Sequence, residues 1–425
     1  MHRKRYLTAS ALLSAGVLML SGCAEGSQTT GNGDPNVVSY IGDEATILPG
    51  VEASAAAIEN NSGITLDART IQSTENYQQV VRSGLSTGNS TDLIKWWNGY
   101  RLQELAKSGE LADLSAEWEA AVSNGWVDDA TRESYSYDGK VYGMPYSKDF
   151  WVIYYNKKVF ADNNLSIPTT WDEFMSNAQT IKEAGVIPLY ATIEPGWTSF
   201  LWFQEILAKL DPQFYVDLTA GEASYTDPIA VEAMEIWADM FEKGFFTPVD
   251  TPWDDEPAML KSGKVAMTAA GSWRNGTFEA AGLTSDDYGV FLLPTVKSDT
   301  EMTVIVESGV FTAADTSSNT EGAKTWLGNL LSPDAQKAYI EAMKSISPNP
   351  SVSIDNAVVK TILQDVDGVK PLVRYWEASP PNLIEGNVKD LAAFMANPSS
   401  GNIQPTLEAM EARAKSEWAD WNSSK

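Results

Sequence analysis

Residues 151–190 read WVIYYNKKVFADNNLSIPTTWDEFMSNAQTIKEAGVIPLY and combine two strand patterns with one helix pattern. The apolar runs at 151–155 and 186–190 have the length of buried strands. Between them, Thr170 and Glu173 have the spacing of a capping box, which marks the start of a helix. The residues that follow on one apolar helical face are Phe174, Ala178 and Ile181. A strand, a helix and a second strand in this order indicate an α/β protein.

The same alternation continues along the rest of the chain. Further short apolar runs predict strands at residues 37–41, 64–66, 93–94, 265–268 and 290–293. Two more helices are predicted, at residues 227–244 and 323–331. Trp237 and Trp326 fall on the apolar faces of these helices, so we expect both in the core. A chain of 425 residues with 43% hydrophobic content can bury more than one core, and more than one lobe is therefore expected.

The N-terminal residues carry the pattern of an export signal. Basic residues at 3–5 precede an apolar run that is too short to span a bilayer comfortably, so residues 1–22 are expected to be removed as a signal peptide. The sequence LSGC at 20–23 resembles the bacterial lipobox, which implies that Cys23 becomes a lipidated N-terminus and anchors the protein to the outer face of the membrane. The alternative is an ordinary signal peptide with a free thiol. Residues 23–36 lack large apolar groups and are predicted to form a flexible tether.

The charge balance and the rarity of histidine and cysteine restrict the chemistry. The chain has 30 Lys and Arg against 57 Asp and Glu, and its one histidine, His2, lies in the expected signal peptide. The mature chain therefore has no Ser-His-Asp or Cys-His nucleophile, no histidine-bearing zinc site and no disulfide. So negative a protein is not expected to bind nucleic acid, because phosphates are bound by Lys and Arg. Phosphate-binding, dinucleotide-binding and EF-hand motifs are missing from the sequence, so no cofactor and no metal are expected.

Loop tryptophans are the clearest sign of a ligand site. The chain has 15 tryptophans, and several fall outside any helical stripe, beside glycines and charged residues: Trp96, Trp97, Trp197, Trp253, Trp273 and Trp376. A flat indole face suits the CH-lined face of a pyranose, while neighbouring polar side chains can bind its hydroxyls. If a sugar covers about 100 Å² of indole, burial at ~25 cal/mol per Å² contributes roughly 2.5 kcal/mol. The alternative for each tryptophan is ordinary core packing.

Short motifs follow one another in a fixed order over the mature chain. They are VVRSGLSTGNSTD (80–92), GELADL (109–114), GKVYGMP (139–145), YYNK (154–157), PTTWDE (168–173), GKVAM (263–267), GSW (271–273) and SPDAQ (332–336). Together they resemble the extracellular solute-binding proteins of carbohydrate ABC transporters, the group that includes maltose-binding protein. The chain departs from the family at Ser90-Thr91-Asp92, where a proline usually precedes the aspartate.

This resemblance implies a two-lobed periplasmic-binding-protein-like α/β fold, with the ligand in a cleft between lobes that close by a hinge motion. The first lobe would comprise residues 37–147 and 291–342, and the second residues 148–290 and 343–420. The positions that match the family's cleft are Asp43, Glu44, Trp96, Trp97, Asp149, Trp151, Glu194, Trp197, Trp273, Arg274, Glu307, Ser308 and Gly309. Further candidates are Asn98, Arg374, Trp376 and the pair Glu75 and Asn76, for which helix capping is the alternative.

Residue type then assigns the roles. We expect Trp97, Trp197 and Trp273 to stack on sugar rings, the carboxylates to accept sugar O–H bonds, and Arg274 to donate. The sequence thus predicts a lipid-anchored, non-enzymatic receptor that captures an oligosaccharide outside the cell and presents it to the membrane permease of an ABC importer. Two alternatives remain open. One is a secreted glycoside hydrolase that uses two carboxylates, and the other is a surface adhesin without a small ligand.

Overall fold

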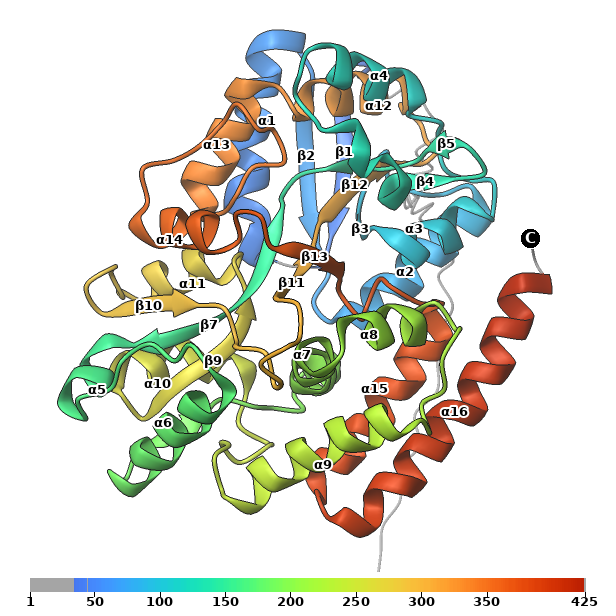
Figure 1. Ribbon diagram of the computed structural model, residues 1–425. Helices are drawn as coiled ribbons and strands as arrows, with labels where there is room; N and C mark the ends of the chain where they lie inside the picture. The colour runs from blue at the N-terminus through green and yellow to red at the C-terminus, as the bar shows by residue number, and fades with distance from the viewer. Residues whose placement is uncertain (1–33, 44, 424–425) are drawn as a thin grey trace, which may run out of the picture. The chain divides into compact units, whose positions relative to one another are not determined.

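Two β-sheets form the framework of the protein, whose computed structural model describes residues 34–43 and 45–423 (Figure 1). The expected signal peptide, the lipidation site Cys23, most of the expected tether and the candidate Glu44 lie outside the described residues.

The first sheet has the strand order β2-β1-β3-β12-β6. Its strands are β2 (Thr65–Thr70), β1 (Val37–Gly42), β3 (Leu93–Trp97), β12 (Gly309–Ala313) and β6 (Met144–Pro145). Strand β1 runs parallel to β2 and β3, whereas β12 runs antiparallel to β3 and β6. All five side chains of β3 are buried, as in a central strand covered on both faces.

The second sheet has the order β13-β11-β7-β9-β8, and β10 also pairs with β7. Its strands are β13 (Lys370–Val373), β11 (Thr303–Glu307), β7 (Asp149–Asn156), β9 (Val265–Gly271), β8 (Ile187–Leu189) and β10 (Tyr288–Phe291). Strands β4 (Ser136–Tyr137) and β5 (Lys140–Val141) form a separate pair. Strands β7 and β8 are both part of this sheet, which confirms the strand patterns at 151–155 and 186–190.

Helices connect the strands and cover the sheets. Those before the return of the chain to the first sheet are α1 (Leu48–Ser62), α2 (Thr74–Thr87), α3 (Gly99–Ala106), α4 (Ser115–Ser123), α5 (Lys157–Asp162), α6 (Trp171–Glu183), α7 (Leu201–Leu210), α8 (Pro212–Thr219), α9 (Pro228–Glu242), α10 (Glu256–Ser262) and α11 (Arg274–Ala280). Those after it are α12 (Thr320–Leu330), α13 (Pro333–Met343), α14 (Ala357–Asp365), α15 (Pro381–Ala396) and α16 (Ser400–Ser423). Helix α1 packs on α13, and α16 packs on α15 and α9 (Figure 1).

The three predicted helices are confirmed with their signals. Thr170 caps α6 in a complete capping box with Glu173, and Trp237 of α9 and Trp326 of α12 are fully buried. Strand β10 begins and ends two residues before the expected run at 290–293. Strands β11 and β12 are not among the strands predicted from sequence.

Three short segments carry the chain between the two sheets. The first joins β6 to β7, the second is Ser308 between β11 and β12, and the third follows α13. Hydrogen bonds tie them together, since Ser308 Oγ donates to the Ser147 carbonyl at 2.7 Å and the Lys148 N–H donates to the Ile346 carbonyl at 3.0 Å. The lobe boundaries stay a prediction. Strand pairing assigns β11 to the second sheet, so a boundary drawn by sheet membership falls at Ser308, later than the expected residue 291.

Candidate ligand-binding site

A cavity of about 70 Å³ lies where the crossing segments meet, and residues from both sheets line it. The lining residues are Ile47, Thr74, Lys95, Trp97, Tyr146, Ser147, Asp149, Trp197, Trp273, Glu307, Ser308, Gly309, Tyr339, Met343, Ser345, Arg374 and Trp376. Strand pairing explains why they meet. The end of β11 places Glu307 opposite Asp149 of β7, and the start of β12 places Gly309 opposite Trp97 of β3.

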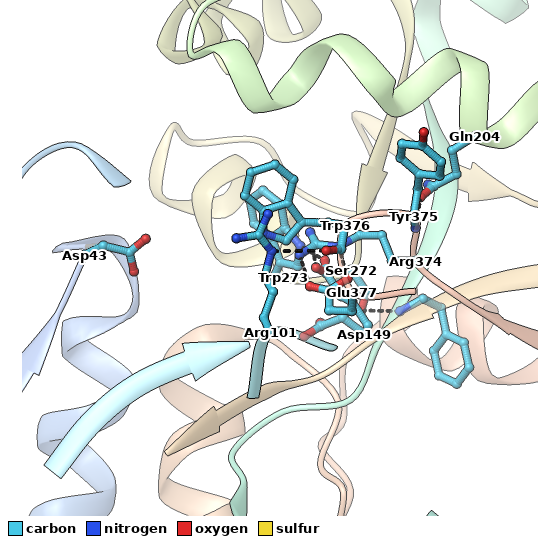
Figure 2. A network of polar contacts seen from close by, with 12 residues as sticks. Asp43, Arg101, Asp149, Gln204, Ser272, Trp273, Arg374, Tyr375, Trp376 and Glu377 are labelled. Atoms are coloured by element: carbon cyan, nitrogen blue, oxygen red, sulfur yellow. Dashed lines mark hydrogen bonds and ion pairs between the residues drawn. The ribbon is translucent and has the colours of Figure 1, made fainter. Parts of the chain in front are cut away.

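A cluster of buried charges lies at the second-sheet side of the cavity (Figure 2). Arg374 forms ion pairs with Glu307 and Glu377, and its Nε lies 2.8 Å from Glu377 Oε2. The indole N–H of Trp273 donates to Glu307 Oε1. Ser272 Oγ donates to Asp149 Oδ1 at 2.7 Å, and this hydrogen bond attaches the loop after β9 to β7. The cluster therefore combines three carboxylates with one guanidinium.

Glu307 is a strongly perturbed acid of this cluster. Burial raises its pKa to about 8; the Arg374 guanidinium opposes this rise, while the neighbouring carboxylates Glu377 and Asp149 add to it. The physical reason is that one cation cannot stabilise three carboxylates removed from water.

A second buried ion pair lies at the first-sheet side. Lys95 of β3 lies 2.9 Å from Asp43, and its Nζ lies 4.2 Å from the centre of the Trp97 ring. Both side chains are almost completely buried. Lys95 lines the cavity, whereas Asp43 lies behind it and holds the ammonium in place.

The tryptophans of the cavity fall into two groups. Trp97 and Trp376 are 8% and 7% exposed, and each carries a cation near one ring face, Lys95 on Trp97 and Arg101 on Trp376. A ligand can therefore meet only their edges or their other faces. Trp197 and Trp273 are only partly buried, with ring centres 6.5 Å apart, and so present more indole surface than Trp97 and Trp376.

Nine of the candidates proposed from sequence line this cavity. They are Trp97, Asp149, Trp197, Trp273, Glu307, Ser308, Gly309, Arg374 and Trp376. Their contact with a ligand stays a prediction, but the structure brings them together from segments far apart in the chain.

Several other candidates are buried away from the cavity. Trp96 is fully buried, and its indole N–H donates to the Arg101 carbonyl at 2.9 Å, because adjacent strand residues point to opposite faces. Trp151 lies within β7, where its neighbours cover it. Arg274 pairs with Glu256 at 2.9 Å under the Trp253 ring instead of reaching the cavity. Asn98 is buried just before α3 and does not line the cavity.

Three further candidates are exposed and outside the cavity. Glu75 accepts a hydrogen bond from Ser73 Oγ at 2.8 Å, and the Asn76 N–H donates to Ser73 Oγ. Both residues therefore belong to the N-cap of α2, as the capping alternative predicts. Glu194 is exposed in the loop that leads to Trp197.

Several residues of the site are not among the candidates predicted from sequence. Lys95, Tyr146 and Tyr339 line the cavity, and Glu377 fixes Arg374. Lys95 had a usable signal, because a charged residue two positions before Trp97 in a strand shares its face. Tyr146 and Tyr339 had none, since tyrosines are common in cores.

No three His, Cys, Asp or Glu side chains within 34–43 and 45–423 are grouped as metal ligands. None of the helices described combines the length and the apolar character needed to cross a membrane.

Comparison with known proteins gives one family and a consistent fold. The family model of the bacterial extracellular solute-binding proteins matches residues 44–337. The diacetylchitobiose binding protein DasA of Streptomyces coelicolor is 25% identical over 415 residues, which cover 90% of this chain and 92% of that protein. The α-glucosides-binding periplasmic protein AglE of Rhizobium meliloti is 24% identical over 303 residues, covering 67% of this chain and 66% of that protein.

Among solved structures, a chitin oligosaccharide binding protein superposes with a TM-score of 0.80 at 16% identity. The match covers 90% of this chain and all of that one. At this identity the likeness concerns the fold, and it confirms the expected two-lobed α/β architecture.

Proposed function

This chain belongs to the family of bacterial extracellular solute-binding proteins, and we propose that it captures an oligosaccharide outside the cell and delivers it to the permease of an ABC importer. The names of its relatives support a carbohydrate ligand, since one binds diacetylchitobiose and another α-glucosides. The family is one of binding proteins, and we propose no catalytic activity for this member.

The observation that carries the proposal is the composition of the cavity. Partly buried Trp197 and Trp273 offer indole surface for sugar rings, while Asp149, Glu307 and Arg374 offer acceptors and donors for hydroxyls. A neutral polyol needs both kinds of contact, because each buried hydroxyl without a partner costs ~1 to 3 kcal/mol. A dense set of paired charges meets this requirement without a net attraction for phosphate.

We propose that the elements lining the cavity move on ligand binding, because residues from both sheets line it and two-lobed binding proteins close around a ligand by hinge motion. Closure can be driven only by contacts that are stronger in the closed state than in the open one.

The membrane attachment is a separate part of the proposal. The LSGC sequence supports lipidation of Cys23, which would hold the receptor close to its permease.

Isothermal titration tests the ligand class. The protein beginning at residue 24 is titrated with maltotriose, raffinose and N,N′-diacetylchitobiose in separate experiments, and at least one should release or absorb heat with saturable binding. Binding of an amino acid or a peptide and of no sugar would overturn the proposal.

Two further measurements separate the alternatives. Overnight incubation with the same sugars, followed by chromatography, should show no products, whereas turnover would indicate a glycoside hydrolase. Small-angle scattering should show a smaller radius of gyration with the bound sugar, whereas an adhesin without a small ligand should not change.

A further inference from the structure

Arg101 is a buried cation next to the site that the sequence analysis did not single out. It lies in the first turn of α3, its side chain is 0% exposed, and it is not among the residues lining the cavity. Its guanidinium carbon lies 3.6 Å from the centre of the Trp376 ring (Figure 2), and its Nε donates to the Trp376 carbonyl at 3.1 Å. A third contact joins Nη1 to Glu385 at 3.0 Å.

The backbone next to Arg101 also contacts residues 374–377, the segment that contains Trp376. The Tyr100 N–H donates to the Glu377 carbonyl at 3.0 Å. Gly99 has a φ of +60°, and a Cβ atom there would lie 2.6 Å from the Glu377 carbonyl oxygen, so this approach requires glycine. Helix α3 follows β3 of the first sheet, whereas residues 374–377 follow β13 of the second.

The segment 374–377 is held from the other side as well. The Arg374 N–H donates to the Val306 carbonyl of β11 at 3.1 Å, and the Tyr375 N–H donates to Gln204 of α7 at 2.9 Å. Arg374 and Trp376 of this segment line the cavity. Two residues of the cavity thus lie on a segment that contacts α3 on one side and β11 and α7 on the other.

Burial of the Arg101 guanidinium costs solvation free energy, so we ask what this side chain provides that an apolar one could not. Burial lowers its pKa to about 10, and its Nη2 has no hydrogen-bond partner among the described residues. Its carboxylate partner Glu385 is one-third exposed. An apolar side chain of similar length would fill the space without this desolvation penalty. A guanidinium adds what such a side chain lacks, namely a flat surface that stacks on indole and a directional donor to a backbone carbonyl.

We infer that Arg101 is a positioning residue of the ligand site, which fixes the orientation of the Trp376 ring and the position of segment 374–377. Through the positions of this ring and this segment it influences the affinity for the ligand without contacting the ligand itself. The ligand part of this inference rests on the proposed function. The structural part, that Arg101 fixes Trp376, does not.

The test compares Arg101→Met and Arg101→Lys with the control Arg82→Met. Arg82 also lies beside Glu385, at 3.9 Å, but its main partner is Glu104, and it forms no contact with Trp376 in the described structure. Each variant is labelled with 5-fluorotryptophan, and the ¹⁹F signal of Trp376 is assigned with Trp376→Phe. Affinity is measured by titration with whichever of maltotriose, raffinose and N,N′-diacetylchitobiose the unchanged protein binds.

We expect Arg101→Met to shift the Trp376 signal and to weaken binding about tenfold, which corresponds to about 1.4 kcal/mol. Arg101→Lys should shift the signal too, because an ammonium neither stacks as a plane nor donates in a fixed fork. Arg82→Met should change neither the signal nor the affinity.

Three outcomes would overturn the inference: wild-type affinity with an unchanged signal in both Arg101 variants, the same loss in Arg82→Met, or failure of both Arg101 variants to fold, which would assign Arg101 to stability alone. If the unchanged protein binds none of the sugars, the proposed function fails, and the Trp376 signal still decides whether Arg101 positions this residue.

Discussion

Replacement of Trp273 separates the two contributions that this residue is expected to make. Its ring centre lies 6.5 Å from that of Trp197 and 6.4 Å from that of Trp253, and its N–H donates to buried Glu307. Trp273→Ala removes both the indole surface and the donor. Trp273→Phe keeps most of the apolar surface and removes only the donor.

The magnitudes follow from these contacts. About 100 Å² of lost apolar contact at ~25 cal/mol per Å² amounts to roughly 2.5 kcal/mol. At 1.4 kcal/mol for each factor of ten, Trp273→Ala should weaken sugar binding roughly 60-fold. Loss of the donor to Glu307 should instead reduce the free energy of unfolding by ~1 to 3 kcal/mol in both variants, since the acceptor remains buried.

The assay is titration of each variant with the bound sugar, together with urea unfolding without sugar. Trp126→Ala is the matched control, because Trp126 is also partly buried but does not line the cavity. Undiminished affinity in Trp273→Ala, or an equal loss in Trp126→Ala, would refute the reasoning.

Three other predictions concern protonation, backbone fit and attachment. Glutamate in an unfolded chain releases its proton near pH 4.5 and folded Glu307 keeps it until about pH 8, so the folded state binds the extra proton between these values and the free energy of unfolding falls as the pH rises. Glu307→Gln should reduce this slope in urea unfolding, and an unchanged slope would contradict the pKa. Gly99→Ala should lower the melting temperature more than Gly88→Ala, because both glycines have a positive φ but only Gly99 lies against another backbone; equal effects would show that the Glu377 contact is unimportant. Cys23→Ala should release the protein from the membrane fraction and leave sugar affinity unchanged, and loss of binding by the released protein would contradict a purely anchoring role.

Local patterns were enough to identify the elements and the most informative residue types. The capping box at Thr170 and the apolar face that follows it were correctly placed, since both depend on residues within one helix. Trp197 lies in a short 3₁₀ helix and Trp273 in the turn before α11, and both line the cavity. These patterns predict local structure reliably because they depend only on residues that are neighbours in the chain.

The sequence could not tell which face of an element meets the cavity. Trp96 and Trp97 are adjacent and equally suited to a sugar, but only one of them can face the cavity from a strand. The register between β12 and β3 places Trp97 opposite Gly309, which lines the cavity, so Trp97 and not Trp96 faces the cavity. Arg274, next to Trp273, does not line the cavity for a similar reason, because Glu256 supplies a buried partner on the other side.

By itself, the sequence determined the α/β class and the kinds of side chain available for a ligand, because composition and short-range spacing encode these properties, and its ordered motifs resembled those of the family. Only the tertiary structure decided which of those side chains share one cavity. Glu307 and Arg374 meet through the pairing of β11 with β13, and Arg101 of α3 reaches the carbonyl of Trp376, over separations in sequence that no local pattern reports. The same long-range contacts raise the pKa of Glu307 and hold Trp376 in place, since both effects arise from burial among distant parts of the chain.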